Sequence, residues 1–170
     1  MSSIIKVDQI QLADGSTPTA GDLGLNVTGG VLQVVNSTIS NAEVNTTSTS
    51  FSSTGHNASI TPSSTSSKIL ILTSGAIYNS TSGFCVLTMY RSIGGGANIE
   101  ITTGNTFGYS FTYSGSSSEH ASPSSCAHLD SPSTTSECVY TVYFRSHTGG
   151  TSYYNINGGR SNITLLEIAG

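Results

Sequence analysis

The sequence predicts an all-β protein: an extended N-terminal arm followed by an antiparallel β-sandwich, with a spacing of strands that favours a jelly-roll-like version. Short apolar runs rich in β-branched residues recur along the chain, and clusters of Gly, Pro and Ser separate them. Glycines interrupt the first part of the chain too often for a helix of ordinary length. We therefore divide the chain into an anchoring arm and linker, residues 1–48, and a sandwich domain, residues 49–170.

The most informative stretch is Ser59–Tyr78. A continuous apolar run follows Lys68 as far as Leu72, and Gly75 closes it. A run of that length with breakers on both sides is typical of a central strand buried on both faces. The preceding residues 61–67 contain one proline and four serines, which predicts a turn before the strand. A strand, a turn and a core strand thus follow one another within a short distance, as in a sandwich.

The arm is predicted from apolar residues that occur in small groups between glycines and prolines. Short extended pieces of this kind cannot stabilise themselves in water, so they need a surface on another protein. We predict that the arm contacts its partner through eight aliphatic residues: Ile4, Ile5, Val7, Ile10, Leu12, Leu23, Leu25 and Val27. A polar linker, Asn36–Ser50, follows the last apolar group.

The sandwich strands are predicted from alternation and from the turn residues between them. The candidates are Thr49–Thr54, Asn57–Ile60, Lys68–Tyr78, Phe84–Arg91, Asn98–Thr103, Thr106–Tyr113, Val139–Arg145, Ser152–Ile156 and Asn162–Ile168. Strand 139–145 has large side chains on both faces, which predicts burial by the core on one side and by a neighbouring subunit on the other. Ser114–Ser136, with its prolines and many serines, is expected to be a surface loop.

Composition narrows the class of protein. Only 8% of the 170 residues are charged, and the formal net charge is −4, so the basic surface that nucleic-acid binding requires is missing. No apolar run approaches the length of a membrane span, and the first residues do not form a signal peptide, so we expect neither a membrane partner nor an oxidising compartment. A hydroxyl-rich surface with few charges is unusual for a monomer and suggests that much of it is covered.

Candidates for chemistry are weak. Glu119, His120, Cys126, His128 and Asp130 lie close together in sequence, but without the spacing of a metal site. Cys126 and Cys138 would pair only if oxidised, and Cys85 is expected to be a small buried hydrophobe. We therefore predict no metal and no cofactor.

Catalytic motifs are also missing from the sequence. There is no G-x-S-x-G nucleophile elbow, and Gly94–Gly96 lacks a phosphate-binding pattern. The carboxylates in the middle of the sandwich domain, Glu100, Glu119, Asp130 and Glu137, have no recognisable context for hydrolysis of a polysaccharide. We expect no enzymatic activity and no catalytic residue. Eight tyrosines without tryptophan fit either a glycan or protein interface or ordinary sheet packing.

Three segments resemble a known group of proteins: SIIKVDQIQLADGSTPTAGDLGLNVTGGVLQVV at the start, TSFSSTGHNASITPSSTSSKILILTSG, and SNITLLEIAG at the end. They are similar to tailed-bacteriophage virion structural proteins of the head-decoration (cement) or tail-fibre type, common in phages of cyanobacteria. The resemblance covers roughly half of the chain and defines no active site. It implies a homotrimer on the outer surface of a phage particle, whose N-terminal arm anchors on the particle and whose β-domain projects outward.

Two functions follow from this resemblance. The first is a homotrimeric capsid cement protein that anchors through its arm to the major capsid protein and stabilises the head. The alternative is a short tail fibre or receptor-binding adhesin, whose loops Ser114–Ser136 and Ile93–Asn98 contact host-surface glycans. The short chain fits the first slightly better. The number of copies per virion would separate head from tail.

Overall fold

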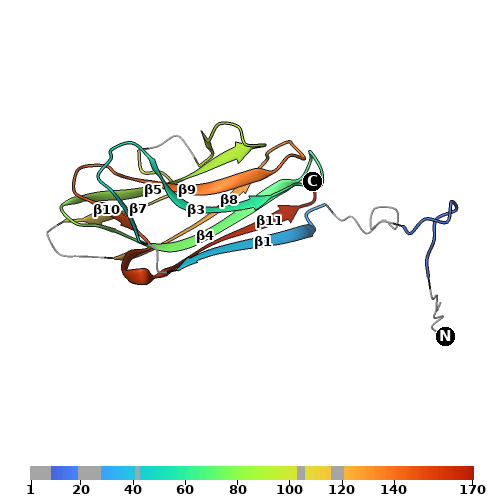
Figure 1. Cartoon of the computed structure of the whole chain (residues 1–170), viewed down its shortest axis with the longest axis horizontal. Coiled ribbons are helices and arrows are strands. Elements are labelled where there is room, and N and C mark those ends of the chain that lie inside the picture. Colours follow the sequence, from blue (N-terminus) through green and yellow to red (C-terminus); the bar gives the residue numbers. More distant parts are fainter. Residues whose placement is uncertain (1–8, 19–27, 41–42, 103–105, 116–120) are drawn as a thin grey trace.

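The structure is a computed structural model, and it describes residues 9–18, 28–40, 43–102, 106–115 and 121–170. Eleven strands of these described residues form two antiparallel sheets that face each other, so the predicted β-sandwich is confirmed. Figure 1 shows the two layers, with β4, β11 and β1 in one and β9 and β5 in the other. Within the described part of the chain the single helix is the short 3-10 turn η1(Ile156–Gly158), and no helix there is long and apolar enough to cross a bilayer.

The first sheet, sheet A, contains six strands: β1(Val31–Ser40), β2(Val44–Thr46), β4(Lys68–Asn79), β8(Ser122–Asp130), β10(Ser152–Tyr154) and β11(Arg160–Ile168). Strand β4 lies at its centre and pairs with β8 along one side. Along the other side β4 pairs first with β11 and then with β10. Strands β1 and β2 in turn pair with β11 and β10. Sheet A is therefore four strands wide, with β1 and β8 as its long edges.

The second sheet, sheet B, contains five strands: β3(Ser52–Ile60), β5(Gly83–Ile93), β6(Ile99–Glu100), β7(Ser110–Ser114) and β9(Cys138–Ser146). Strand β9 lies between β3 and β5, and the short strands β6 and β7 share the free side of β5. The pairings of both sheets are nested in the sequence, because β1 pairs with β11, β3 with β9, β4 with β8 and β5 with β7. The innermost of these nested pairs is β5 with β7, so the two halves of the chain on either side of this pair run back along each other.

The core lies between the sheets and is built from alternate residues of each strand. On β4 the buried side chains are Ile69 and Ile71, and on β9 they are Tyr140, Val142 and Phe144. Each fully buried side chain of this size contributes on the order of 2 kcal/mol to stability. Other members of the same cluster are Ile60, Ile77, Cys85, Leu87, Met89, Tyr154, Ile163 and Leu165.

Two groups of polar side chains in the interior are paired by hydrogen bonds. Asp130 Oδ2 accepts hydrogen bonds from Arg91 Nη1 at 2.6 Å and from the Tyr140 hydroxyl at 2.8 Å, which ties β8 to sheet B. His56 Nδ1 and the Tyr154 hydroxyl lie 2.7 Å apart and share a hydrogen bond. Burial lowers the pKa of His56 and raises the pKa of Tyr154 to about 12, so both are neutral near pH 7.

A buried carboxylate closes one end of sheet A. Glu167 on β11 accepts hydrogen bonds from the Ser63 backbone N–H at 2.7 Å, the Ser63 hydroxyl at 2.6 Å and Gln33 Nε2 at 2.6 Å. Burial raises the pKa of Glu167, but the hydrogen bonds from Ser63 and Gln33 lower it by more. The pKa of Glu167 is therefore below its ordinary value. The ionised carboxylate therefore joins the turn before β4 to β1 and β11.

Several expectations about strands need correction. Strands β1 and β2 belong to sheet A, although the sequence placed them in the arm and its polar linker, so the sandwich begins at Val31 and not at residue 49. Ser114–Ser136 is not a loop, because it contains β8, which pairs with β4 over nine residues. The predicted strands 49–54 and 57–60 are one strand, β3, whose register shifts at Gly55, where φ is +75°.

The central strand was predicted to be buried on both faces, and this is wrong for the single chain. Ile69 and Ile71 are buried, whereas Leu72 on the opposite face is 40% exposed. The sequence shows a continuous apolar run because both faces of β4 are apolar, but only one of them packs on the core. Within the part of the chain that the structure describes, the other face is exposed at Leu72 and, on β8, at Leu129.

Candidate interaction face

The predicted arm residues fall mostly outside the described part of the chain. This applies to Ile4, Ile5, Val7, Leu23, Leu25 and Val27. Ile10 and Leu12 are described, and their side chains are 50% and 37% exposed. Figure 1 shows residues 9–18 standing apart from the sandwich.

A formed turn begins at Leu12, two residues after Ile10. The Gly15 N–H donates to Leu12 O at 2.9 Å and the Leu12 N–H donates to Ser16 O at 2.9 Å, while Gly15 has a φ of +84°. This is the pattern of a three-residue hairpin loop with glycine in the left-handed position. Asp14 Oδ1 accepts hydrogen bonds from the Ser16 N–H and hydroxyl. These two bonds lower the pKa of Asp14, which is therefore ionised at neutral pH.

The chain joins the sandwich beside its C-terminus. The Gly29 N–H donates to Ala169 O and the Ala169 N–H donates to Gly30 O, both at 2.8 Å. Strand β1 then starts at Val31 and pairs with Ile168 of β11. The N-terminal segment and the C-terminal end of β11 therefore lie at the same end of sheet A (Figure 1).

An apolar stripe crosses the outer face of sheet A at this end. The register places one outward residue of each of four neighbouring strands side by side, and we call this set the aliphatic row: Val34, Leu166, Leu70 and Leu129. Val34 is 59% exposed and Leu129 is 51% exposed. Leu72 lies in the next row, two residues along β4, and Val31 and Leu32 flank the row on β1 with exposed fractions of 54% and 45%.

Uncharged polar side chains continue the same face. Asn36 Nδ2 donates to Thr164 Oγ1 at 2.8 Å, and Thr38 Oγ1 donates to Asn162 Oδ1 at 2.7 Å. We call these four residues of β1 and β11 the polar ladder. Because the side chains satisfy one another across the strands, the ladder presents a flat surface with few free hydrogen-bonding groups.

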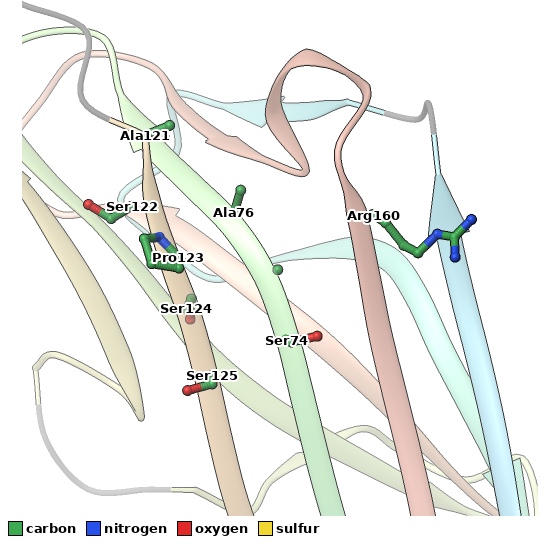
Figure 2. Close-up of a pocket in the computed structure, with 9 residues that line it drawn as sticks. Ser74, Ala76, Ala121, Ser122, Pro123, Ser124, Ser125 and Arg160 are labelled. Atoms are coloured by element: carbon green, nitrogen blue, oxygen red, sulfur yellow. The ribbon is translucent and has the colours of Figure 1, made fainter.

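A hollow of about 590 Å³ lies at the far end of this face. Figure 2 shows Ser74 and Ala76 of β4 beside Pro123 and Ser125 of β8, with Arg160 of β11 on the opposite side. Small side chains leave this space open. A Cβ on Gly75 would lie 2.6 Å from Ser161 Oγ, so glycine there allows β11 to approach β4.

The outer face of sheet B differs because the chain's own side chains cover it. Tyr90 and Tyr143 have ring centroids 4.1 Å apart, and Phe51 lies edge-on to Tyr90. The Arg145 guanidinium lies 4.7 Å from the centroid of the Phe51 ring and donates to Thr49 O. This face was expected to be covered by a neighbouring subunit, yet the chain already supplies much of that cover.

A second aromatic group surrounds β7. Phe84 contacts Phe107, Phe111, Tyr113 and His147, with ring centroids between 4.7 and 5.9 Å apart. Phe111 and Tyr113 are 51% and 54% exposed. We call these five residues the β7 aromatic cluster. The Ile93–Asn98 loop, one of the predicted glycan contacts, forms a turn at Gly94 and Gly95 with positive φ.

Three of the five side chains considered for metal binding lie in the described part of the chain. Glu119 and His120 lie outside the described residues, while Cys126, His128 and Asp130 share the inward face of β8, with Asp130 bound to Arg91 and Tyr140. Among the residues that the structure describes, no three His, Cys, Asp or Glu side chains converge on a possible ion.

The three cysteines are free thiols, so Cys126 and Cys138 are not paired. Cys85 is fully buried, as expected, and burial raises its pKa to about 12. A thiol with that pKa is a poor nucleophile at neutral pH.

The sequence reading missed the aliphatic row because its residues are far apart in the chain. Val34 and Leu166 come together only when β1 pairs with β11, and Leu129 lies in a segment interpreted as a loop. The one available signal was Leu70 and Leu72, which alternate with core residues Ile69 and Ile71. A run that is apolar on both faces of a strand indicates that both faces are covered.

Comparison with known proteins gives no assignment. No family model and no curated protein matches this chain.

Proposed function

We propose that this protein is a structural subunit of a phage particle: a homotrimeric capsid cement protein on the outer surface of the virion, which anchors to the major capsid protein through its N-terminal arm. The observation that carries the proposal is the segment of residues 9–18. It stands apart from the sandwich with a formed turn and two exposed aliphatic side chains, Ile10 and Leu12. Exposed apolar residues on a preformed turn favour docking on another protein, because the turn reduces the entropy lost on binding.

The strand order supports the jelly-roll version of the sandwich. Each sheet is four strands wide, and the pairing is nested in the sequence as an eight-stranded jelly roll requires. The order across sheet A is β1/β2, β11/β10, β4 and β8, and the order across sheet B is β3, β9, β5 and β7/β6. This architecture is used in viral capsid and lectin domains. It is compatible with both the cement protein and the adhesin.

Trimerisation strengthens a weak anchor. The two exposed aliphatic side chains in the described part of each arm offer little binding energy on their own, but after one arm docks, the other two bind at high effective concentration. A shell protein can thus be held firmly by contacts that are weak one at a time.

The experiment uses the alternation of residues 9–12. Ile10→Asp with Leu12→Asp places two charges on the apolar face of the segment, while the matched control, Gln9→Asp with Gln11→Asp, adds the same charge on the other face. Each protein is mixed with phage heads that lack it and sedimented. We expect the first variant to bind at least about 100-fold more weakly and the control to bind like the natural protein, because only the first loses apolar contact. Equal binding by both variants would exclude the arm as the anchor.

The alternative, a short tail fibre or adhesin for host-surface glycans, is favoured by the β7 aromatic cluster. Phe111 and Tyr113 project from an edge strand with half of their surface exposed. Aromatic rings with exposed faces are suited to ligand binding. Saturable binding of the purified protein to host envelope polysaccharide, lost in Phe111→Ala with Tyr113→Ala, would establish this function in place of the first.

A further inference from the structure

We infer that the outer face of sheet A, from the aliphatic row to the polar ladder, is the surface on which a second copy of this chain packs. The inference rests on the homotrimer of the proposed function and adds to it the surface that holds the copies together. Its occupant is another copy of the chain, for the four reasons that follow.

The first reason is exposure. Val34, Leu72 and Leu129 are between 40% and 59% exposed, and the register joins them through Leu70 and Leu166 into one apolar surface across four strands. Soluble monomers seldom expose a contiguous apolar surface of this kind without using it for binding. Sheet B also exposes Phe111 and Tyr113, but these two rings pack on Phe84. Its other outward rings, Tyr90 and Tyr143, pack on each other and on Phe51.

The second reason is the low cost of removing this face from water. None of the residues of the aliphatic row or the polar ladder is charged, so no ion is desolvated when a partner covers them. The amide of Asn36 and the hydroxyl of Thr38 already have partners on β11. A buried polar group that keeps its hydrogen bond costs little, whereas an unpaired one costs about 1–3 kcal/mol.

The third reason identifies the occupant. A surface without charges is best met by another surface without charges, because a charged partner would be desolvated without compensation. Only 8% of the residues of this chain are charged, so a second copy has the required composition. The aliphatic row and the polar ladder occupy three rows of outward residues on four strands. They span on the order of 400 Å², about half of the roughly 800 Å² that each partner gives to a stable interface. Val31 and Leu32 extend the same surface.

The fourth reason is the edge at which the row ends. Strand β1 is ten residues long and contains neither a charged residue nor a proline. Natural proteins normally protect a free edge of this length with such residues or cover it. The opposite edge, β8, has Pro123 and ends at Asp130. A second copy on the outer face of sheet A would also cover β1.

The test compares two pairs of exposed apolar residues. Val34→Glu with Leu129→Glu places charges in the aliphatic row, and the matched control, Phe111→Glu with Tyr113→Glu, places them in the β7 aromatic cluster. The four side chains have similar exposed fractions, 51% to 59%, so neither double variant removes a fully buried contact. Sedimentation velocity over a wide range of protein concentration measures association, and circular dichroism measures the fold.

We expect the natural protein and the control to sediment as trimers and the row variant as a folded monomer, with association weakened at least 100-fold. If the row variant loses its fold, Leu72→Asn replaces it. This change is milder, lies on the same face, and should also weaken association. The proposed surface would be overturned if the row variant stays trimeric, or if only the control dissociates. Neither result would contradict the trimer itself. A natural protein that is monomeric at every concentration would instead overturn the trimer itself.

Discussion

The outer faces of the two sheets both carry apolar side chains but differ in how these side chains pack. On sheet B, Tyr90, Tyr143 and Phe51 pack on one another, and Arg145 lies over Phe51 and bonds to the backbone at Thr49. On sheet A, the aliphatic row points to solvent with nothing above it among the described residues. One face serves the stability of the single chain, and the other is available for a partner.

The difference follows from side-chain length and shape. Large aromatic rings on neighbouring strands reach one another and bury their own area, whereas leucine and valine on a flat sheet are too short to do so. The location of an interface can therefore be inferred from which apolar residues fail to cover themselves.

The largest effect is expected beneath the open face, at Glu167. Glu167→Ala removes a fully buried side chain together with the hydrogen bonds that it accepts from the Ser63 N–H, the Ser63 hydroxyl and Gln33 Nε2. This change should lower the free energy of unfolding by about 3 kcal/mol. Urea denaturation at pH 7 measures this loss. An unchanged stability would mean that the turn at 61–67 is not held by the carboxylate.

Acid should reproduce part of that loss in the natural protein. The pKa of Glu167 is lowered in the folded state from its ordinary 4.5, so its contribution is complete above pH 4.5 and is lost as pH falls through the folded-state value. The pH dependence below 4.5 should be weaker in Glu167→Gln, which cannot ionise. Identical acid titrations for the two proteins would exclude this role.

A smaller loss of stability is expected when one outward side chain of each sheet is replaced by alanine. Tyr143→Ala removes the ring that stacks on Tyr90 and should cost about 2 kcal/mol of stability in the monomer. Leu129→Ala, on the open face, should change it by less than about 0.5 kcal/mol. Thermal denaturation at a concentration where the protein is monomeric measures both. Equal losses would show that the aliphatic row is not free in the single chain.

The smallest effect on stability is expected for the N-terminal segment. Removing residues 1–27 leaves Gly29 and Gly30 bonded to Ala169 and should change the free energy of unfolding by less than about 0.5 kcal/mol, because Ile10 and Leu12 are exposed. A truncation through Asn36 would instead remove part of β1 and test the sheet, not the arm. A large loss of stability in the shorter truncation, measured by urea denaturation, would place the arm within the fold.

The sequence predicted those strands whose inward residues are large and apolar. Strands β4, β5, β9 and β11 were located to within two or three residues, since residues such as Ile69, Tyr140 and Leu165 make their alternation clear. Strand β8 was missed because its inward residues are Ser124, Cys126, His128 and Asp130, which have the composition of a loop. Its strand conformation comes from pairing with β4.

The arm and the interaction face show a different limit of sequence reading. The apolar group at Val31–Val35 has the same local pattern as the arm that precedes it, and its place in sheet A depends on β11, more than a hundred residues later in the chain. Local patterns cannot reveal such pairing. A local pattern was enough to propose Ile10 and Leu12 as arm residues, and that proposal stays a prediction, while the aliphatic row required the register of four strands.

Hydroxyl-radical footprinting with mass spectrometry most directly tests the claim that the outer face of sheet A is the covered surface of an assembly subunit. Oxidation of each side chain reports its contact with water in the assembled protein, without any mutation. We predict that Val34, Leu72 and Leu129 are protected as the protein concentration rises into the range of the trimer, while Phe111 and Tyr113 remain reactive. Protection of Phe111 and Tyr113 with full reactivity of Val34 and Leu129 would contradict the account.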